Sequence, residues 1–241
     1  MIPIDKLRTT YQLLRAGEVR AALDELDLPN RAAAARARAE TAVRRAWMKY
    51  ALRTVRQNDA HDRLDLAYKM PDPWHMASPQ EQARFAETNA VIERALGDHF
   101  ATLLEVGCGE GHQTEHLLVL ADHVTGIDVS ATAVARARAR LADLGSACDF
   151  AAGDIYAMPW IDEVGRFELV TACEVIYYMS DMPKFLATMD RLGRANLVTY
   201  FAPAARKVEA HVKAMPGVEF GGFRHGDVEW VAAWWAGQAS R

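Results

Sequence analysis

The hydrophobic pattern divides the chain into an N-terminal part with helical periodicity and a C-terminal part where strand-like and helix-like segments alternate. Up to residue 60, apolar positions recur near helical spacing, without strand-like runs or glycine-rich turns. After residue 100, short runs rich in Val, Ile and Leu are separated by stretches of helical periodicity. We therefore predict a helical extension over residues 1–60 and one α/β domain over residues 61–241.

The extension contains two predicted helices. The first covers residues 4–26, and "DLPN" separates it from a second helix from Arg31 to about Arg56, with Asn30 as its N-cap. The second helix is rich in arginine, and Glu40 is its one acidic residue. We interpret it as a solvated helix rather than a platform for an anionic partner. Its predicted packing stripe consists of Val43, Trp47, Ala51 and Val55.

Residues 61–80 contain three prolines and are predicted to be a loop that leads into a helix. Ser78 and Glu81 have the spacing of a capping box, and Pro79 suits the first helical position. This pattern places the start of the helix near Ser78.

The alternating segments after residue 100 predict the sheet. The expected parallel strands are residues 102–107, 123–129, 148–154, 167–175 and 195–201. The helices between them are residues 112–121, 131–144 and 182–193. Two further runs, 218–224 and 228–236, flank "HGD" and indicate an antiparallel hairpin. We predict an α/β, doubly wound, Rossmann-like sheet of about seven strands, mostly parallel, with this hairpin at its C-terminal end.

Composition and charge argue against several classes of protein, including membrane proteins and zinc-binding proteins. An apolar fraction of 51% is enough for a sizeable core, and a formal charge of −4 gives no overall attraction to nucleic acid. No apolar stretch has the length of a membrane span, and the N-terminus has no signal-peptide core. The three cysteines lack zinc spacing. We expect a cytoplasmic protein with no membrane partner.

A glycine-rich loop follows the first predicted strand. Gly107, Gly109 and Gly111 give G-x-G-x-G, and His112 stands where a dinucleotide fingerprint needs glycine or alanine. Glu105, two residues before the first glycine, is poorly matched to a phosphate and well matched to a cation. The loop therefore favours a ligand with an amine or sulfonium over a pyrophosphate.

Acidic residues end the next two predicted strands. Asp128 is placed to accept hydrogen bonds from both ribose hydroxyls, and Asp154 from an adenine amino group that Ile155 would cover. Each aspartate alone is equally consistent with a helix N-cap. Because the carboxyl ends of parallel strands meet at one edge, their combination with the glycine loop predicts a nucleoside site.

Over about residues 80–235 this constellation resembles the class I S-adenosylmethionine-dependent methyltransferases. The resemblance implies S-adenosyl-L-methionine as cofactor, with S-adenosyl-L-homocysteine as product. It implies that the three loop glycines and Glu105 surround the methionine part, Asp128 the ribose, and Asp154 with Ile155 the adenine. The remaining expected cofactor contacts in the strand-end loops are Cys108, Val129 and Cys173.

The stretches "DPWHMASPQEQARF", "LEVGCGEGHQTEHL" and "FELVTACEVIYYMSDM" are similar to the NodS-like group, which N-methylates a deacetylated amino-sugar end. The resemblance implies that Trp74 and Arg84 approach the cofactor. It also implies that Glu174, Tyr177 and Tyr178 line the acceptor side as catalytic residues. The helical extension and the segment after the fifth strand depart from the group's pattern. The resemblance therefore supports the assignment of the cofactor better than the assignment of the acceptor.

Other acceptors and roles remain open at this point. An amine must be neutral to attack, whereas a hydroxyl acceptor needs a base, for which His75, His112 and His225 are available. His112 and His116 share a helix face, but no third ligand is evident, so we expect no metal.

The expected acceptor is a small molecule, an amino sugar or other saccharide. A nucleic-acid acceptor is disfavoured because the fourth strand lacks "NPPY" or "DPPY". The N-terminal helices are a candidate lid, docking surface or homodimer contact. The three tryptophans of the last strand are predicted to be buried, in the core or in a dimer: Trp230, Trp234 and Trp235.

Overall fold

The computed structural model describes residues 9, 12–13, 28–53 and 61–241. The chain divides into two units, residues 1–50 and residues 51–241, which are described separately. The predicted helix over residues 4–26 lies almost wholly outside the described residues. The predicted domain boundary at residue 60 stays a prediction, because residues 54–60 also lie outside them.

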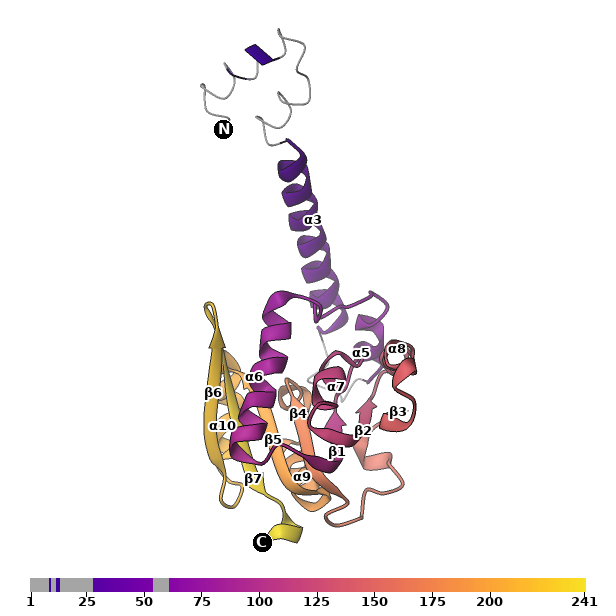
Figure 1. The fold of residues 1–241 in the computed structure, drawn as a ribbon, viewed down its shortest axis with the longest axis vertical. Helices are drawn as coiled ribbons and strands as arrows, with labels where there is room; N and C mark the ends of the chain where they lie inside the picture. The colour runs from indigo at the N-terminus through magenta and orange to yellow at the C-terminus, as the bar shows by residue number, and fades with distance from the viewer. Residues whose placement is uncertain (1–8, 10–11, 14–27, 54–60) are drawn as a thin grey trace. The chain divides into compact units, whose positions relative to one another are not determined.

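Helix α3 (Leu28–Ala51) is the principal described element of the first unit (Figure 1). It begins at Leu28, so the predicted N-cap Asn30 lies inside the helix. The physical reason is that Pro29 is tolerated in a first turn, where its missing N–H would have no partner. Val43, a predicted packing residue, is 61% exposed. Trp47 is half-buried and Ala51 is buried, so the prediction holds only toward the C-terminal end of the helix, and Val55 lies outside the described residues.

The second unit begins with a short helix that the sequence analysis assigned to a loop. Helix α5 (His61–Ala67) is attached by Asp65, whose carboxylate accepts hydrogen bonds from Ser130 Oγ at 2.6 Å and from the Thr132 N–H at 3.2 Å. These partners are distant in sequence, and a seven-residue helix is not stable by itself. Local periodicity therefore could not reveal it.

Helix α6 (Pro79–Ala95) begins as predicted. Ser78 is its N-cap, with the side chain accepting from the Glu81 N–H at 3.4 Å, and Pro79 takes the first position. The reciprocal half of a capping box is not made. The Glu81 carboxylate instead accepts from Arg84 Nε at 2.6 Å, because a buried guanidinium needs a charged partner.

The seven strands form one sheet in the order β3-β2-β1-β4-β5-β7-β6. Strands β1 to β5 pair in parallel, and β7 pairs antiparallel with both β5 and β6. This confirms the predicted fold class. The bounds are β1 Phe100–Val106, β2 Ala121–Asp128, β3 Cys148–Ala152, β4 Phe167–Cys173, β5 Gly193–Phe201, β6 Glu219–His225 and β7 Val228–Ala236.

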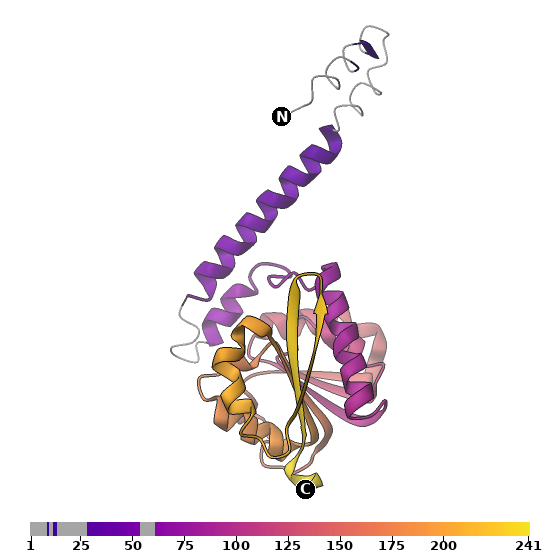
Figure 2. The same cartoon turned by 90° about the vertical axis from the view of Figure 1, so that its left-hand side faces the viewer.

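Helices cover both faces of this sheet, with α6 on one side and α9 and α10 on the other (Figure 2). The crossover helices are α7 (His112–Leu117), α8 (Ala131–Arg140) and α9 (Met182–Leu192). Helix α10 (Ala205–Val212) was not predicted. It buries Val208 and Val212, one turn apart, and is too short for periodicity to identify.

The core has two large apolar clusters, one on each side of the sheet, and a third, smaller cluster that includes Val134 and Ala137 of α8. Trp230 and Trp235, five residues apart on β7, are 2% and 1% exposed and belong to opposite clusters, as strand alternation requires. Trp234 packs against the Trp230 cluster. The tryptophans of the last strand are therefore core residues.

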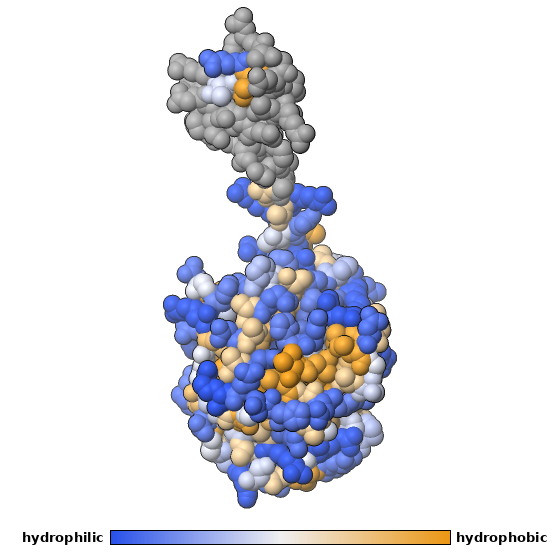
Figure 3. Space-filling view, viewed as in Figure 1, coloured by the Kyte–Doolittle hydropathy of each residue, from blue (hydrophilic) through white to orange (hydrophobic). Residues whose placement is uncertain are grey.

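The face of the second unit that Figure 3 shows is mostly hydrophilic. Apolar side chains gather where Figure 1 draws α7, and Val119, two residues beyond this helix, is 77% exposed. Among the described residues, no helix is both long enough and apolar enough to cross a membrane.

Candidate functional site

A cavity of about 720 Å³ opens at the carboxyl edge of the parallel strands. Its walls come from the ends of β1 to β4, from α6 and from the segment around α5. This volume suits a small-molecule or cofactor site. The cavity is lined by every predicted site residue but one: Trp74, Arg84, Glu105, Gly107, Cys108, Gly109, His112, Asp128, Val129, Asp154, Ile155, Cys173, Glu174, Tyr177 and Tyr178.

At two glycines of the loop, Gly107 and Gly109, the backbone lines the cavity without a side chain. Gly107 (φ +78°) and Gly109 (φ +54°) have left-handed conformations that side chains disfavour. A Cβ on Gly107 would collide with Val175, and one on Gly109 would lie 2.9 Å from Tyr68 Oη.

Gly111 is the predicted residue that does not line the cavity. It is the N-cap of α7, and a Cβ there would lie 3.1 Å from Ala137 Cβ on α8. Its small size is needed for helix packing, and its expected contact with the methionine part stays a prediction.

The predicted nucleoside residues are held by backbone hydrogen bonds. Asp128 Oδ2 accepts from the Gly109 N–H at 3.0 Å, and Oδ1 accepts from the Ser130 N–H at 2.9 Å. A carboxylate oxygen can accept more than one hydrogen bond, so these contacts are compatible with a ligand hydroxyl at Asp128. Asp154 caps a 3₁₀ turn by accepting from the Tyr156 N–H at 3.0 Å, and also lines the cavity.

A buried guanidinium lies close to buried carboxyl groups. Arg84, 2% exposed, donates to Glu81 at 2.6 Å and to Gln113 Oε1 at 3.0 Å. Glu105, 3% exposed, accepts from Thr114 Oγ1. Burial raises the pKa of Glu105 to about 7, while the Thr114 hydrogen bond and the Arg84 charge act in the opposite direction.

Glu174, just after β4, combines backbone strain with an unsatisfied carboxylate. Its φ is +61°, a conformation rare for a residue with a side chain and typical of functional positions. Oε2 accepts from Tyr177 Oη at 2.9 Å, while Oε1 is buried without a hydrogen-bond partner among the described residues. Burial raises the pKa of Glu174 to about 7.

Aromatic rings stand beside this carboxylate. The centroids of Tyr177 and Tyr178 are 4.7 Å apart, and Trp74 lies 5.7 Å from Tyr178. Trp74 comes from the proline-rich segment before α6, where Asp72 and His75 have positive φ. A strained loop therefore places Trp74 against the segment that follows β4.

His112 is poorly suited to act as a base. Its Nε2 lies 2.7 Å from Arg140 Nη2, and because a guanidinium only donates, Nε2 must be the acceptor. The neutral ring then has its proton on Nδ1 and no free lone pair. Burial and the charge of Arg140 lower the pKa of His112. His75 and His225 are exposed and do not line the cavity.

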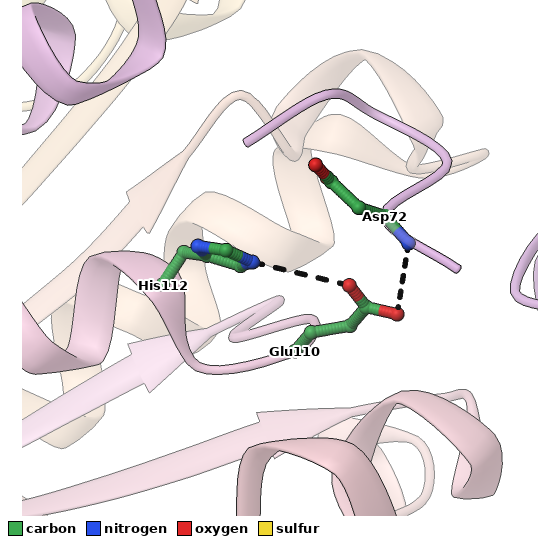
Figure 4. Close-up of side chains that lie close together, drawn as sticks. All are labelled: Asp72, Glu110 and His112. Carbon is green, nitrogen blue, oxygen red and sulfur yellow. Dashed lines mark hydrogen bonds and ion pairs between the residues drawn. The ribbon is translucent and has the colours of Figure 1, made fainter. Parts of the chain in front are cut away.

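Asp72, Glu110 and His112 bring three possible metal-binding atoms within 4.8 Å of one another (Figure 4). Glu110 stands between the other two, next to the Asp72 N–H and the imidazole (Figure 4). Arg136 Nη1 donates to Glu110 at 2.5 Å, as Arg140 does to His112. These two cations compete with a metal. We therefore interpret Glu110 as a structural residue, whose carboxylate pairs with Arg136 and accepts a hydrogen bond from the Asp72 N–H, which links the loop before α6 to the glycine-rich loop.

Sequence reasoning missed several residues that line the cavity. Tyr68 lies over Gly109, and Gln113 contacts Arg84. Neither belongs to a motif, although Gln113 lies two residues beyond the loop's last glycine. His116, considered earlier as a metal partner of His112, instead contacts Gln82 Oε1 at 3.2 Å. The other lining residues not predicted include Leu64, Met76, Glu81, Tyr156, Met179 and Lys184.

The architecture is a Rossmann-like methyltransferase fold. The crystal structure of the N-methyltransferase NodS from Bradyrhizobium japonicum WM9, in complex with S-adenosyl-L-homocysteine, superposes with a TM-score of 0.61. The alignment covers 74% of this chain and 98% of that structure at 23% identity.

Residues 56–206 match the family described as nodulation protein S (NodS), and the chain belongs to this family. Nodulation protein S from Bradyrhizobium diazoefficiens is 32% identical over 61% of this chain and 66% of its own length. A ubiquinone biosynthesis O-methyltransferase from Aromatoleum aromaticum is 30% identical over 54% of this chain. The chain spans about half of that enzyme, 55% of its length.

Proposed function

We propose that this protein is an S-adenosyl-L-methionine-dependent methyltransferase that acts on the amine nitrogen of a small molecule, an amino sugar or sugar-containing metabolite. The observation that supports this most directly is Glu174, which lines the cavity and has a buried carboxylate oxygen without a hydrogen-bond partner among the described residues. The NodS family membership supports the same reaction class.

The cavity fits the proposed cofactor. Gly107 and Gly109 leave a cradle that a Cβ would fill, and Asp128 is fixed at the end of the adjoining strand. We assign the ribose to Asp128, the adenine to Asp154 with Ile155, and the amino-acid part to the region of Glu105. When bound, the cofactor supplies an electrophilic methyl group on a sulfonium.

The residues after β4 suit an amine acceptor. An alkylammonium must lose a proton before its nitrogen has a lone pair for attack. Glu174, with a pKa of about 7, is ionised over much of the neutral range and accepts that proton at Oε1. Tyr177 holds the other oxygen and thereby orients the carboxylate. Trp74 and Tyr178 provide apolar surface for the acceptor.

O-methylation is the second candidate, because several relatives are named as O-methyltransferases. A hydroxyl acceptor needs a stronger base, usually histidine. Among the described residues, His112 is the one histidine that lines the cavity, and Arg140 occupies its acceptor nitrogen. The contact between Arg140 and His112 therefore favours N-methylation over O-methylation.

The role of the N-terminal helices, including a homodimer contact, and a cytoplasmic location stay predictions. A nucleic-acid acceptor stays disfavoured because the chain has a net charge of −4.

Mass spectrometry of candidate acceptors incubated with the protein and S-adenosyl-L-methionine tests the proposal. The panel contains partly deacetylated chitooligosaccharides, their fully N-acetylated forms and free amino sugars. We expect a gain of one methylene confined to compounds with a free amine. A gain on the fully N-acetylated forms would indicate O-methylation. No gain on any compound, together with tight binding of S-adenosyl-L-homocysteine, would reject the amino-sugar acceptor and keep the cofactor.

A further inference from the structure

Gln113 lines the cavity with a buried amide that is only half satisfied. It is 5% exposed, and its Oε1 accepts from Arg84 Nη1 at 3.0 Å. A guanidinium has no acceptor, so this contact fixes which end of the amide faces Arg84. The other end, Nε2, is buried and has no hydrogen-bond partner among the described residues. Such a donor costs free energy unless a ligand accepts from it.

The neighbours of Gln113 indicate the chemistry of that ligand. Thr114, the next residue, donates to Glu105, so one turn of α7 borders both the Gln113 amide and a buried carboxyl group. Glu105 suits a cationic group, whereas the Nε2 donor and the guanidinium of Arg84 suit an anionic one. A ligand with an ammonium and a carboxylate on one carbon matches this pair.

We infer that Gln113 binds the carboxylate of the amino-acid end of S-adenosyl-L-methionine through Nε2, while Oε1 holds Arg84 in place. The inference rests on the proposed function, since it concerns the same cofactor. Gln113 then has two roles, ligand binding through Nε2 and a hydrogen bond from Arg84 to Oε1. A substitution that changes only the Nε2 end can separate them.

Gln113→Glu separates the two roles. The substitution keeps an oxygen for Arg84 and replaces the Nε2 donor with an acceptor that repels a carboxylate. Gln113→Leu removes both contacts without adding charge. The matched control is Gln80→Glu, which makes the same chemical change at an exposed position outside the cavity.

Isothermal titration calorimetry with two ligands is the test. S-adenosyl-L-homocysteine has the amino-acid end, and 5′-methylthioadenosine lacks it. For Gln113→Glu we expect the affinity for S-adenosyl-L-homocysteine to fall by about tenfold to a hundredfold, typical of a lost hydrogen bond to a charged group. Affinity for 5′-methylthioadenosine should not change, and Gln80→Glu should bind both ligands like the wild type.

Other outcomes overturn the inference. An unchanged affinity of Gln113→Glu and Gln113→Leu for S-adenosyl-L-homocysteine, with or without a weaker acceptor KM, would assign Nε2 to another group. Equal losses for both ligands would make Gln113 a structural residue. Failure of the wild-type protein to bind either ligand would instead reject the proposed cofactor, so the two failures are distinguishable.

Discussion

The two halves of the cavity satisfy their polar groups differently. In the nucleoside half, both oxygens of Asp128 accept backbone hydrogen bonds, and Asp154 caps a turn. In the proposed acceptor half, Glu174 has a strained backbone and a carboxylate oxygen without a hydrogen-bond partner among the described residues. The first half is organised without a ligand, whereas the second retains an unsatisfied group that a ligand must complete. Backbone strain combined with an unpaired carboxylate oxygen therefore marks Glu174, where we propose the reaction.

Removing the charge of Glu174 should have the largest effect. Glu174→Gln keeps the shape and the Tyr177 contact but cannot accept a proton. We expect turnover to fall by about a hundredfold to ten-thousandfold, typical of a lost general base, with S-adenosyl-L-homocysteine affinity within about twofold of wild type. Steady-state kinetics and calorimetry measure the two quantities.

The pH profile distinguishes this role from a structural one. Wild-type turnover should rise with pH through about 7, as Glu174 loses its proton, and the variant should lack this rise. Glu163→Gln, on an exposed loop, is the control and should keep both rate and profile. A variant with wild-type turnover would contradict the assigned role.

The next largest effect is expected at the glycine loop. Gly109→Ala places a methyl group 2.9 Å from Tyr68 Oη at a φ of +54°. Gly226, with φ +58° and nothing within 4 Å of an added Cβ, provides a control that also has a positive φ and has no clash. Both alanine variants should lose about 1 kcal/mol of unfolding free energy. Only Gly109→Ala should lose S-adenosyl-L-homocysteine affinity, and equal affinity losses would argue against a cradle.

The two buried glutamates should make stability depend on pH. Folding raises the pKa of Glu105 and of Glu174 from 4.5 to about 7, so the native state binds more protons than the unfolded state between these values. The contribution of these two groups to the unfolding free energy should therefore be greatest below pH 4.5. It should decrease as the pH rises to about 7, by at most roughly 3 kcal/mol for each group.

Denaturant titrations across this pH range test the sign. Glu105→Gln and Glu174→Gln should each flatten the decrease. A wild-type stability that rises from pH 5 to pH 7, with the same slope in both variants, would show that neither carboxyl group is desolvated.

The smallest effect on turnover is expected at His112. His112→Phe removes the acceptor for Arg140, and we expect a loss of about 1 kcal/mol in unfolding free energy with turnover within about threefold of wild type. His112→Gln offers Arg140 an amide oxygen and should restore stability. A large loss of turnover in both variants, with stability retained, would revive His112 as a base.

Much of the fold and half of the site followed from local sequence signals. The strand and helix order was predictable because buried strands and crossover helices have different periodicities. The loop glycines and Asp128 were recognisable because their spacing follows the strand ends. Helix α5 and helix α10 were missed, since neither is long enough for a periodic pattern. Gly111 was assigned to the ligand, although its neighbour is Ala137 on another helix.

The sequence by itself determined which residues meet at the carboxyl edge, because strand order in a parallel sheet places successive strand ends together. The tertiary structure alone decided the chemical state of those residues. The raised pKa of Glu174, the neutral ring of His112 and the Gln113 donor, which has no partner among the described residues, all depend on burial and on contacts distant in sequence. Protonation and hydrogen bonding are set by the three-dimensional environment, which no local pattern contains.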